Sequence, residues 1–360
     1  MLLGLLFAGS LFWRLTYLHR LSASPLAESL NADARVYWDW AGWLMHRSPV
    51  GSQPFFLGPL YPYVLALMRA VTGDSMPAVL AIEAVWGAAT VILLADTVRR
   101  IAGWRIGIII GVLLGANEMM VFFDGLILSE SLLLFLGALL VWWIAWFDWT
   151  QPPRYAFAGI GCLVGLLAAG RATGLLLMVP CLLGILPLRW PLGRASWLGS
   201  LTALAACAIV ILPIAVRNYV VGGELIPITY NAGYNLYVGN NPDANGASVS
   251  IVGVTSLSTS GRIPEDGSEI DGRDYLRRTG NLSLSPLASS RYWSDAAWRY
   301  IAAHRFETLR LMLTKLGMLW NRREYSQIER VQEYREWAGP VGLPWLGSFA
   351  LLGLLSIAGV

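Results

Sequence analysis

The chain has 360 residues, of which 56% are hydrophobic and 14% are charged, and its mean hydropathy is +0.55. These values, together with 17 tryptophans, exclude an ordinary soluble globular protein and indicate one that spans a membrane several times. The formal net charge of +3 is spread along the chain, whereas nucleic-acid binding would need a concentrated basic face. The three cysteines lie inside apolar runs without metal-type spacing, so we interpret them as core residues.

Apolar runs long enough to cross a bilayer recur along the chain, since a membrane-spanning helix needs about 20 residues. They predict an all-α integral membrane protein, a bundle of about eight spans. The predicted helices are 1–18, 77–97, 103–121, 126–147, 155–170, 172–188, 196–215 and 341–360. The last run ends with the given sequence, which leaves room for further helices after Val360.

Basic residues in three short loops predict the orientation of this bundle, because such residues favour the cytoplasm. The residues are Arg99, Arg100, Arg105, Arg154, Arg189 and Arg194. The expected organisation is then a transmembrane bundle over 1–215 that includes a first outer loop over 19–76. An outer-face region with amphipathic juxtamembrane helices follows over 216–340, and a last transmembrane helix over 341–360. We take the first helix as an anchor, since no clear signal-peptide cleavage site follows it.

The stretch LNADARVYWDWA, residues 30–41, places two carboxylates and a guanidinium among large aromatic rings. At the outer mouth of a helix bundle, Asp33 could take a proton from an acceptor hydroxyl, and the nearby Arg35 would keep it ionised. A solvated loop acid is the alternative, and the spacing alone does not choose between the two.

FFLGPLYPY, residues 55–63, leads into another apolar run and contains Tyr61. Prolines at its start and aromatic rings around them predict a helix that lies along the membrane surface and anchors the loop.

Three further acids fall in or beside predicted spans. Glu83 lies within one, where a bare carboxylate is costly, so it should face the bundle interior. Asp124 and Glu130 bracket the start of another in FFDGLILSE. There the helix dipole would stabilise an acid, while contact with a metal ion or substrate is the functional alternative.

Arg171 in AAGRATG occupies the outer hinge between two apolar helices. Its guanidinium could hold a phosphate in a bidentate manner at the depth of the lipid headgroups. Snorkelling of the side chain to the interface explains the same placement.

The segment 217–246, which follows the seventh predicted span, is rich in Tyr and Asn. Amides and ring faces bind sugars, although the same residues also build turns and interfacial belts. The candidates here are Arg217, Asn235, Tyr237 and Asn240. Further along, HRFETLRLMLTKLGMLWNRREY, residues 304–325, is typical of an amphipathic helix on the membrane and carries Lys315 and Glu324.

These segments together carry a resemblance to a known family. NADARVYWDWA, FFLGPLYPYVLAL, FFDGLILSE, AAGRATGLLLMVP, LPIAVRNYVVGGELIPITYNAGYNLYVGNNP and KLGMLWNRREY occur in that order over nearly the whole chain. The chain resembles the family-39-like glycosyltransferases of bacterial membranes, which have the C-type fold. These enzymes are relatives of the protein O-mannosyltransferases and of the aminoarabinose transferase of lipid A.

The resemblance implies an enzyme of the inner (plasma) membrane whose active site faces the periplasm or exterior. It would move a sugar from a polyprenyl-phosphate carrier to an acceptor lipid, glycan or protein, with inversion. Asp33 matches the catalytic acid, with Tyr37 as a neighbour, and Ala34 stands where the family often has a second acid. Glu130, Arg171, Lys315 and Glu324 match further family positions, with Arg35, Arg171 and Lys315 as donor-phosphate ligands. No cofactor is firmly implied, and a divalent metal ion is left open.

Two other classes of protein are the alternatives to this enzyme. A secondary transporter or flippase would usually show internal repeats and polar sites near the bilayer midplane, whereas the polar residues here gather at one face. A non-catalytic assembly subunit would be indicated if Asp33, Glu130 and Arg171 lay far apart. The sequence contains no P-loop and no Rossmann fingerprint, so a nucleotide-binding site is not expected.

Overall fold

The computed structural model describes residues 1–27, 29–185, 194–247, 251, 271–319 and 329–343. Regular structure in these residues is helical, and their β-structure is limited to one isolated bridge between Asn117 and Leu343. The α-helices of the first half are α1 (Leu2–Ser22), α2 (Ala32–His46), α3 (Leu60–Thr72), α4 (Met76–Ala102), α5 (Trp104–Gly115), α6 (Glu118–Phe123), α7 (Glu130–Trp146) and α8 (Arg154–Gly170). A 3-10 helix η1 (Ala172–Leu177) then precedes α9 (Met178–Ile185), α10 (Arg194–Gly222), α11 (Ala232–Gly239), α12 (Arg273–Gly280), α13 (Pro286–Ala303), α14 (Arg305–Leu319) and α15 (Val331–Ala338).

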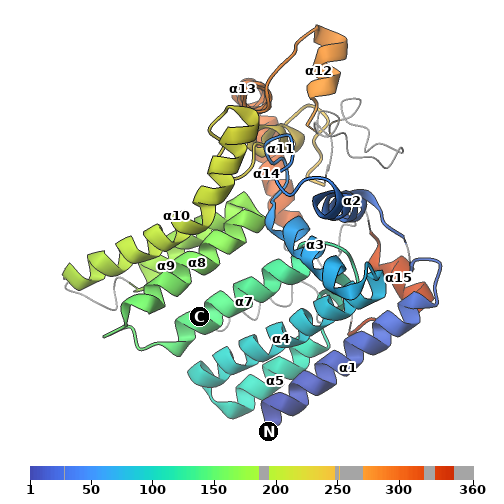
Figure 1. Ribbon diagram of the computed structural model, residues 1–360, viewed down its shortest axis with the longest axis vertical. Helices are drawn as coiled ribbons and strands as arrows, with labels where there is room; N and C mark the ends of the chain where they lie inside the picture. The colour runs from blue at the N-terminus through green and yellow to red at the C-terminus, as the bar shows by residue number, and fades with distance from the viewer. Residues whose placement is uncertain (28, 186–193, 248–250, 252–270, 320–328, 344–360) are drawn as a thin grey trace.

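The apolar helices form a slab in which α4 packs on α1, α5 and α7, and α8 packs on α7 and α10 (Figure 1). Small residues let α8 and α10 approach closely. A Cβ atom on Gly161 would lie 2.0 Å from the Ala203 carbonyl oxygen, so a larger residue would not fit there. Close approach over small residues is the usual way in which helices associate within a bilayer.

Within the described residues, three helical segments are long and apolar enough to cross a membrane, namely Leu2–Ser22, Met76–Ala102 and Trp197–Gly222. Shorter apolar helices lie between them in the slab, which agrees with a multi-pass membrane protein. The predicted number of eight spans stays a prediction, and the last of them, over 341–360, lies outside the described residues apart from its first three positions.

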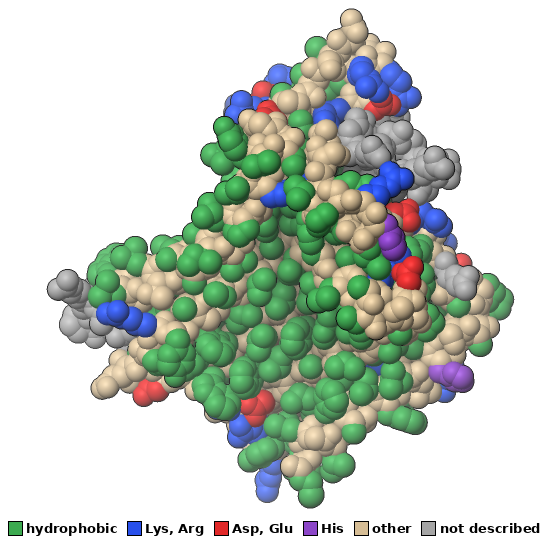
Figure 2. Space-filling view, viewed as in Figure 1, with side chains coloured by type: hydrophobic (Ala, Val, Ile, Leu, Met, Phe, Trp, Pro, Cys, Tyr) green, Lys and Arg blue, Asp and Glu red, His purple; other side chains and the backbone are tan. Residues whose placement is uncertain are grey.

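The surface agrees with a membrane environment. In Figure 2 hydrophobic side chains predominate over the slab, while charged side chains gather at its edges and over the lobe above it. A broad apolar face of this kind is expected where lipid is the solvent.

The helix predicted over 103–121 is interrupted in the structure. Helix α5 ends at Gly115, and α6 starts again at Glu118 after a cap in which the Asn117 side chain accepts a hydrogen bond from the Met120 amide. The Ala116 carbonyl oxygen accepts a hydrogen bond from the Leu343 amide, at a distance of 2.9 Å. A segment more than 200 residues away therefore contacts the break, and the local apolar pattern could not reveal it.

The predicted first outer loop folds into α2 and α3. Pro59 precedes α3, and Gly73 ends it with a left-handed φ of 66° that suits glycine. With 13 residues, α3 is about 20 Å long, which is shorter than the hydrocarbon core of a bilayer. This length agrees with the predicted surface helix.

A lobe of helices α11 to α14 stands above the slab at the end of α10 (Figure 1). Helix α10 continues to Gly222, past the end predicted at 215. Asn218, which is fully buried, donates to the carbonyl oxygens of Ile226 and Ile228 and accepts from the Phe55 amide. This one amide therefore joins the first outer loop to the base of the lobe.

Candidate functional site

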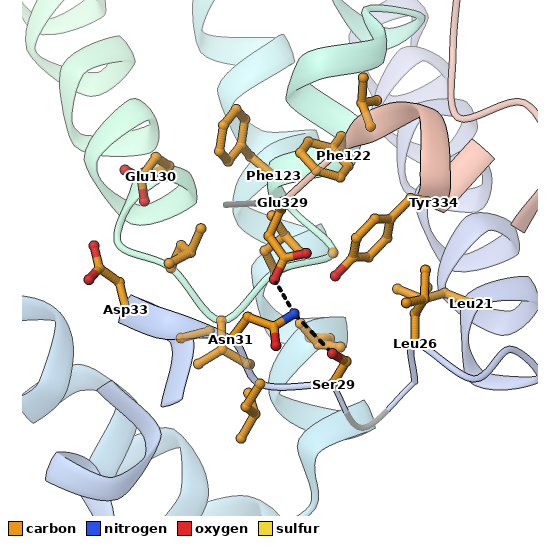
Figure 3. Close-up of a pocket in the computed structure, with 18 of the residues that line it drawn as sticks. Leu21, Leu26, Ser29, Asn31, Asp33, Phe122, Phe123, Glu130, Glu329 and Tyr334 are labelled. Carbon is orange, nitrogen blue, oxygen red and sulfur yellow. Dashed lines mark hydrogen bonds between the residues drawn. The ribbon is translucent and has the colours of Figure 1, made fainter. Parts of the chain in front are cut away.

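A cavity of about 350 Å³ lies where the loop before α2, the loop between α6 and α7, and the start of α15 meet (Figure 3). Its polar lining comes from Ser29, Asn31, Asp33, Glu130, Arg171 and Glu329. Leucine, methionine and phenylalanine side chains make up most of the remaining wall. The cavity thus combines an apolar body with a few converging polar groups, as small-molecule sites usually do.

Asp33 lies in the first turn of α2, half-buried at one side of the cavity. Among the described residues, its carboxylate has no hydrogen-bond or ion-pair partner. Burial raises the pKa of Asp33, the negative charge of Glu130 raises it further, and the positive charge of Arg171 lowers it. Asp33 is therefore a carboxylate of increased basicity that is open to a ligand.

Glu130 and Arg171 form an ion pair next to Asp33. Glu130 starts α7, and Arg171 directly follows α8 at the predicted hinge. The Arg171 side chain is 63% exposed, which leaves guanidinium N–H groups available to an anion even though one binds Glu130.

The position of Arg171 depends on a close backbone contact. Gly58 in the first outer loop packs so tightly on Gly170 that a Cβ atom at Gly58 would lie 1.8 Å from the Gly170 carbonyl oxygen. The loop that contains α2 and α3 is thereby pressed against the end of α8, and this contact fixes the distance between the two segments that line the site.

A column of polar groups continues from Asp33 into the slab. Tyr37, one turn along α2, is buried and hydrogen-bonded to Ser129, and burial followed by the charge of Asp33 raises the pKa of Tyr37 to about 12. The ring of Tyr37 meets the edge of the Tyr61 ring, with 5.1 Å between centroids. The Tyr61 hydroxyl donates to Glu83, which is fully buried as predicted.

Asp124 forms a second buried group beside this column. Its carboxylate accepts hydrogen bonds from Arg14 Nε at 2.7 Å and from the Ser131 hydroxyl at 2.8 Å. A Cβ atom on Gly87 of α4 would lie 1.9 Å from the same carboxylate, so the pair occupies the space that the glycine leaves. Asp124 therefore joins α1, α4 and α7, and it is not among the residues that line the cavity.

Three of the basic residues predicted to belong to the site do not line the cavity. Arg35 donates to the Leu30 carbonyl oxygen, and its charge lowers the pKa of Asp39. The positive charge that lowers the pKa of Asp33 is that of Arg171, where the sequence predicted Arg35. Arg217 holds the carbonyl oxygens of Val50 and Gln53, at 2.5 and 2.6 Å. Lys315 donates to the Gly239 carbonyl oxygen at 2.7 Å, and burial lowers its pKa.

The candidates of the 231–246 stretch lie in or beside α11, in the upper lobe. Asn235 is exposed, Asn240 donates to the Leu236 carbonyl oxygen, and the ring of Tyr237 packs on Trp293. None of these side chains lines the cavity. Glu324 lies outside the described residues.

The sequence alone does not indicate Asn31, Glu329 or Tyr334 as site residues, although all three line the cavity. The Asn31 side-chain amide donates to Glu329 and to Ser29, each at 3.0 Å, and the Tyr334 hydroxyl donates to Glu329. In Figure 3 this group lies between the Asp33 side of the cavity and an apolar side formed by Leu21 and Leu26. Nothing in the local sequence around Glu329 indicates this contact, because Asn31 is 298 residues away.

Divalent-ion binding would need several ligands at one point. In the part of the chain that the structure describes, no group of three His, Cys, Asp or Glu side chains is close enough to hold a metal ion.

The arrangement suits proton transfer next to an anion. Asp33 can accept a proton, and Arg171 can face a negatively charged group a short distance away. The burial of Asp33 strengthens its interactions with the charges around it.

Residues 52–216 match the family model described as dolichyl-phosphate-mannose-protein mannosyltransferase. The matched part is a little under half of the chain and contains Glu130 and Arg171, while Asp33 precedes it. No curated protein matches the chain.

Among solved structures, the chain is similar to one from S. cerevisiae, the protein O-mannosyltransferase Pmt1-Pmt2 complex bound to the sugar donor. The identity is 17% and the TM-score is 0.49, over 65% of this chain and 35% of the yeast chain. The chain therefore spans about a third of the length of the yeast protein. The family match confirms the resemblance to the protein O-mannosyltransferases, a family of membrane glycosyltransferases.

Proposed function

We propose that this chain, a relative of the protein O-mannosyltransferases, is an inverting glycosyltransferase that moves a sugar from a polyprenyl-phosphate carrier to an acceptor on the outer face of the membrane. The observation that carries the proposal is the unpartnered carboxylate of Asp33 beside the Glu130–Arg171 pair at the edge of one cavity. The family match over Glu130 and Arg171 supports it.

The proposed reaction is a single displacement. The acceptor hydroxyl gives its proton to Asp33 while its oxygen forms a bond to the anomeric carbon. The bond from that carbon to the phosphate oxygen breaks, and the phosphate leaves with the bonding electron pair. Attack opposite to the leaving group inverts the anomeric centre.

Two features of the site favour this displacement. The raised pKa of Asp33 makes it a stronger proton acceptor than an ordinary aspartate. The exposed face of Arg171 can stabilise the charge that grows on the departing phosphate, which is the kind of electrostatic contribution that usually dominates.

The distribution of basic residues supports an outer-face location. Arg99 and Arg100 end α4, and Arg154 starts α8, whereas Glu130 at the cavity starts α7 and Arg171 follows α8. The cavity and these cations therefore lie at opposite ends of the slab helices. Since basic residues in short loops favour the cytoplasm, the cavity would face outward from a plasma membrane.

The proposal is tested by changing Asp33 to Asn and measuring release of polyprenyl phosphate from labelled polyprenyl phosphate mannose in membranes. We expect transfer to fall by at least about 100-fold, since general-base contributions are of this order. Asp39→Asn on the same helix is the matched control and should keep most of the activity, because Asp39 does not line the cavity.

Measurements of the unfolding temperature distinguish a variant that has lost catalysis from one that no longer folds. Because the pKa of Asp33 is higher in the folded chain than in the unfolded chain, ionised Asp33 opposes folding above that pKa. Asp33→Asn should therefore unfold at a temperature no lower than the wild type. Full transfer activity in this variant would refute the role of Asp33.

A further inference from the structure

Glu329 enters the cavity from a part of the chain that is remote in sequence from Asn31, Asp33 and the other acidic and basic residues of the site. It lies two residues before the start of α15 and accepts hydrogen bonds from Asn31 and Tyr334. Figure 3 shows its carboxylate above Asn31, between the Asp33 side and the apolar side. It is half-buried and lines the cavity.

Other contacts hold this segment in place without Glu329. Arg335 binds Glu118 through bonds of 2.6 and 2.7 Å. The indole N–H of Trp13 donates to the Val341 carbonyl oxygen at 2.9 Å. Since these anchors lie outside the cavity, the carboxylate of Glu329 is not needed to dock α15.

In the pair formed by Glu329 and Asn31, the groups that remain open to a ligand are hydrogen-bond acceptors. The Asn31 amide donates to Ser29 and to Glu329, so the atoms left to a ligand are its carbonyl oxygen and the remaining lone pairs of the Glu329 carboxylate. Such a surface binds hydroxyl groups and repels a phosphate, whose natural partner in the cavity is Arg171.

We infer that Glu329 and Asn31 form a hydroxyl-binding subsite that holds sugar hydroxyls while the carrier phosphate lies toward Arg171. The inference rests on the proposed function and adds the direction in which the substrate lies. The hydroxyls belong either to the sugar on the carrier or to a glycan acceptor, since both offer the same donors.

The test uses the full-length protein in detergent with Glu329→Gln and Asn31→Ala. Binding of polyprenyl phosphate mannose and of bare polyprenyl phosphate is measured for each, together with the KM for acceptor in the transfer assay. Glu333→Gln is the matched control, since Glu333 is exposed on α15. Asn31 is itself exposed, so its replacement keeps the test valid if Glu329→Gln reduces folding.

If the carried sugar occupies the subsite, both variants lose about tenfold in affinity for the mannose-bearing carrier and keep their affinity for the bare carrier. If a glycan acceptor occupies it, both carriers bind as before and the KM for acceptor rises by a similar factor. Either result supports the subsite.

Unchanged binding and unchanged KM in both variants would overturn the subsite, and so would an equal loss for both carriers. The Asp33→Asn result would be unaffected by that outcome. A wild-type protein that neither binds nor cleaves any polyprenyl-phosphate sugar offered to it, hexosyl or pentosyl, would overturn the proposed function, and the subsite with it.

Discussion

The basicity of Asp33 is set by two neighbours of opposite charge. Glu130 raises the pKa of Asp33 and Arg171 lowers it, after burial has made the largest contribution. Glu130 and Arg171 also bind each other, so changing either alters both the charge near Asp33 and the geometry of the pair.

The pH dependence of transfer should therefore move in opposite directions in two variants. Asp33 must be ionised to accept a proton, so kcat/KM falls as the pH falls through its pKa. Glu130→Gln removes a charge that raises this pKa, and the acid limb of the profile should shift to lower pH. Arg171→Gln removes a charge that lowers it, and the limb should shift to higher pH.

The measurement is kcat/KM for polyprenyl phosphate mannose across the acid range for the wild type and both variants. Arg35→Gln is the control and should leave the limb in place, because Arg35 is not among the charges that affect Asp33. Shifts of the same sign in Glu130→Gln and Arg171→Gln would contradict the assigned electrostatics.

Single residues were predictable from the sequence to the extent that their local context was unusual. An acid at the start of an apolar run and an arginine between two apolar helices selected Glu130 and Arg171, and the structure brings them together with Asp33. Arg217 and Lys315 had similar local contexts, yet they bind backbone carbonyl groups elsewhere. The partner of a long cationic side chain is a property of the tertiary fold, which the sequence pattern does not contain.

At the scale of elements, the site depends on how the loop that carries α2 and α3 docks on the end of α8. Gly58 and Gly170 meet there backbone to backbone, and Arg171 is the next residue. Apolar runs predicted α4, α7, α8 and α10 well, because length and composition determine helices in a membrane. The contact between Gly58 and Gly170 is not encoded by any such run.

Gly58→Ala should therefore reduce both stability and transfer. The added Cβ would lie 1.8 Å from the Gly170 carbonyl oxygen, so one of the two backbones must move. We expect a lower unfolding temperature and at least about a tenfold loss of kcat/KM, since small displacements of positioned groups have large effects on rate.

Gly137→Ala provides the control for this substitution. A Cβ atom at Gly137, within α7, meets nothing within 4 Å, so alanine should be neutral or stabilise the helix slightly. If Gly58→Ala and Gly137→Ala have the same unfolding temperature and activity, the Gly58 contact does not position Arg171.

At the scale of the whole molecule, the segment 329–343 at the end of the described chain packs against helix α1 at its beginning. Tyr334 and Val341 pack in one buried cluster with Tyr17 of α1 and Phe122 of α6. The bridge between Asn117 and Leu343 continues this contact at the break between α5 and α6. One wall of the cavity therefore exists only when the segment is docked.

The pair Glu118–Arg335 tests this docking. The Glu118 side chain is 4% exposed, so removing its partner leaves a buried charge without compensation. Breaking a buried pair costs about 3–5 kcal/mol, and the 37% exposure of Arg335 reduces the expected loss in Arg335→Gln to about 1–3 kcal/mol.

The double variant Glu118→Gln with Arg335→Gln removes both charges and should recover most of the lost unfolding temperature, because no buried charge is left unpaired. Thermal unfolding of the wild type, both single variants and the double variant completes the cycle. Since Glu329 lies at the start of the same segment, Arg335→Gln should also weaken binding of polyprenyl phosphate mannose. Additive effects of the two single changes would show that Glu118 and Arg335 do not act as a pair, and the docking of the cavity wall would then have to rest on the apolar cluster alone.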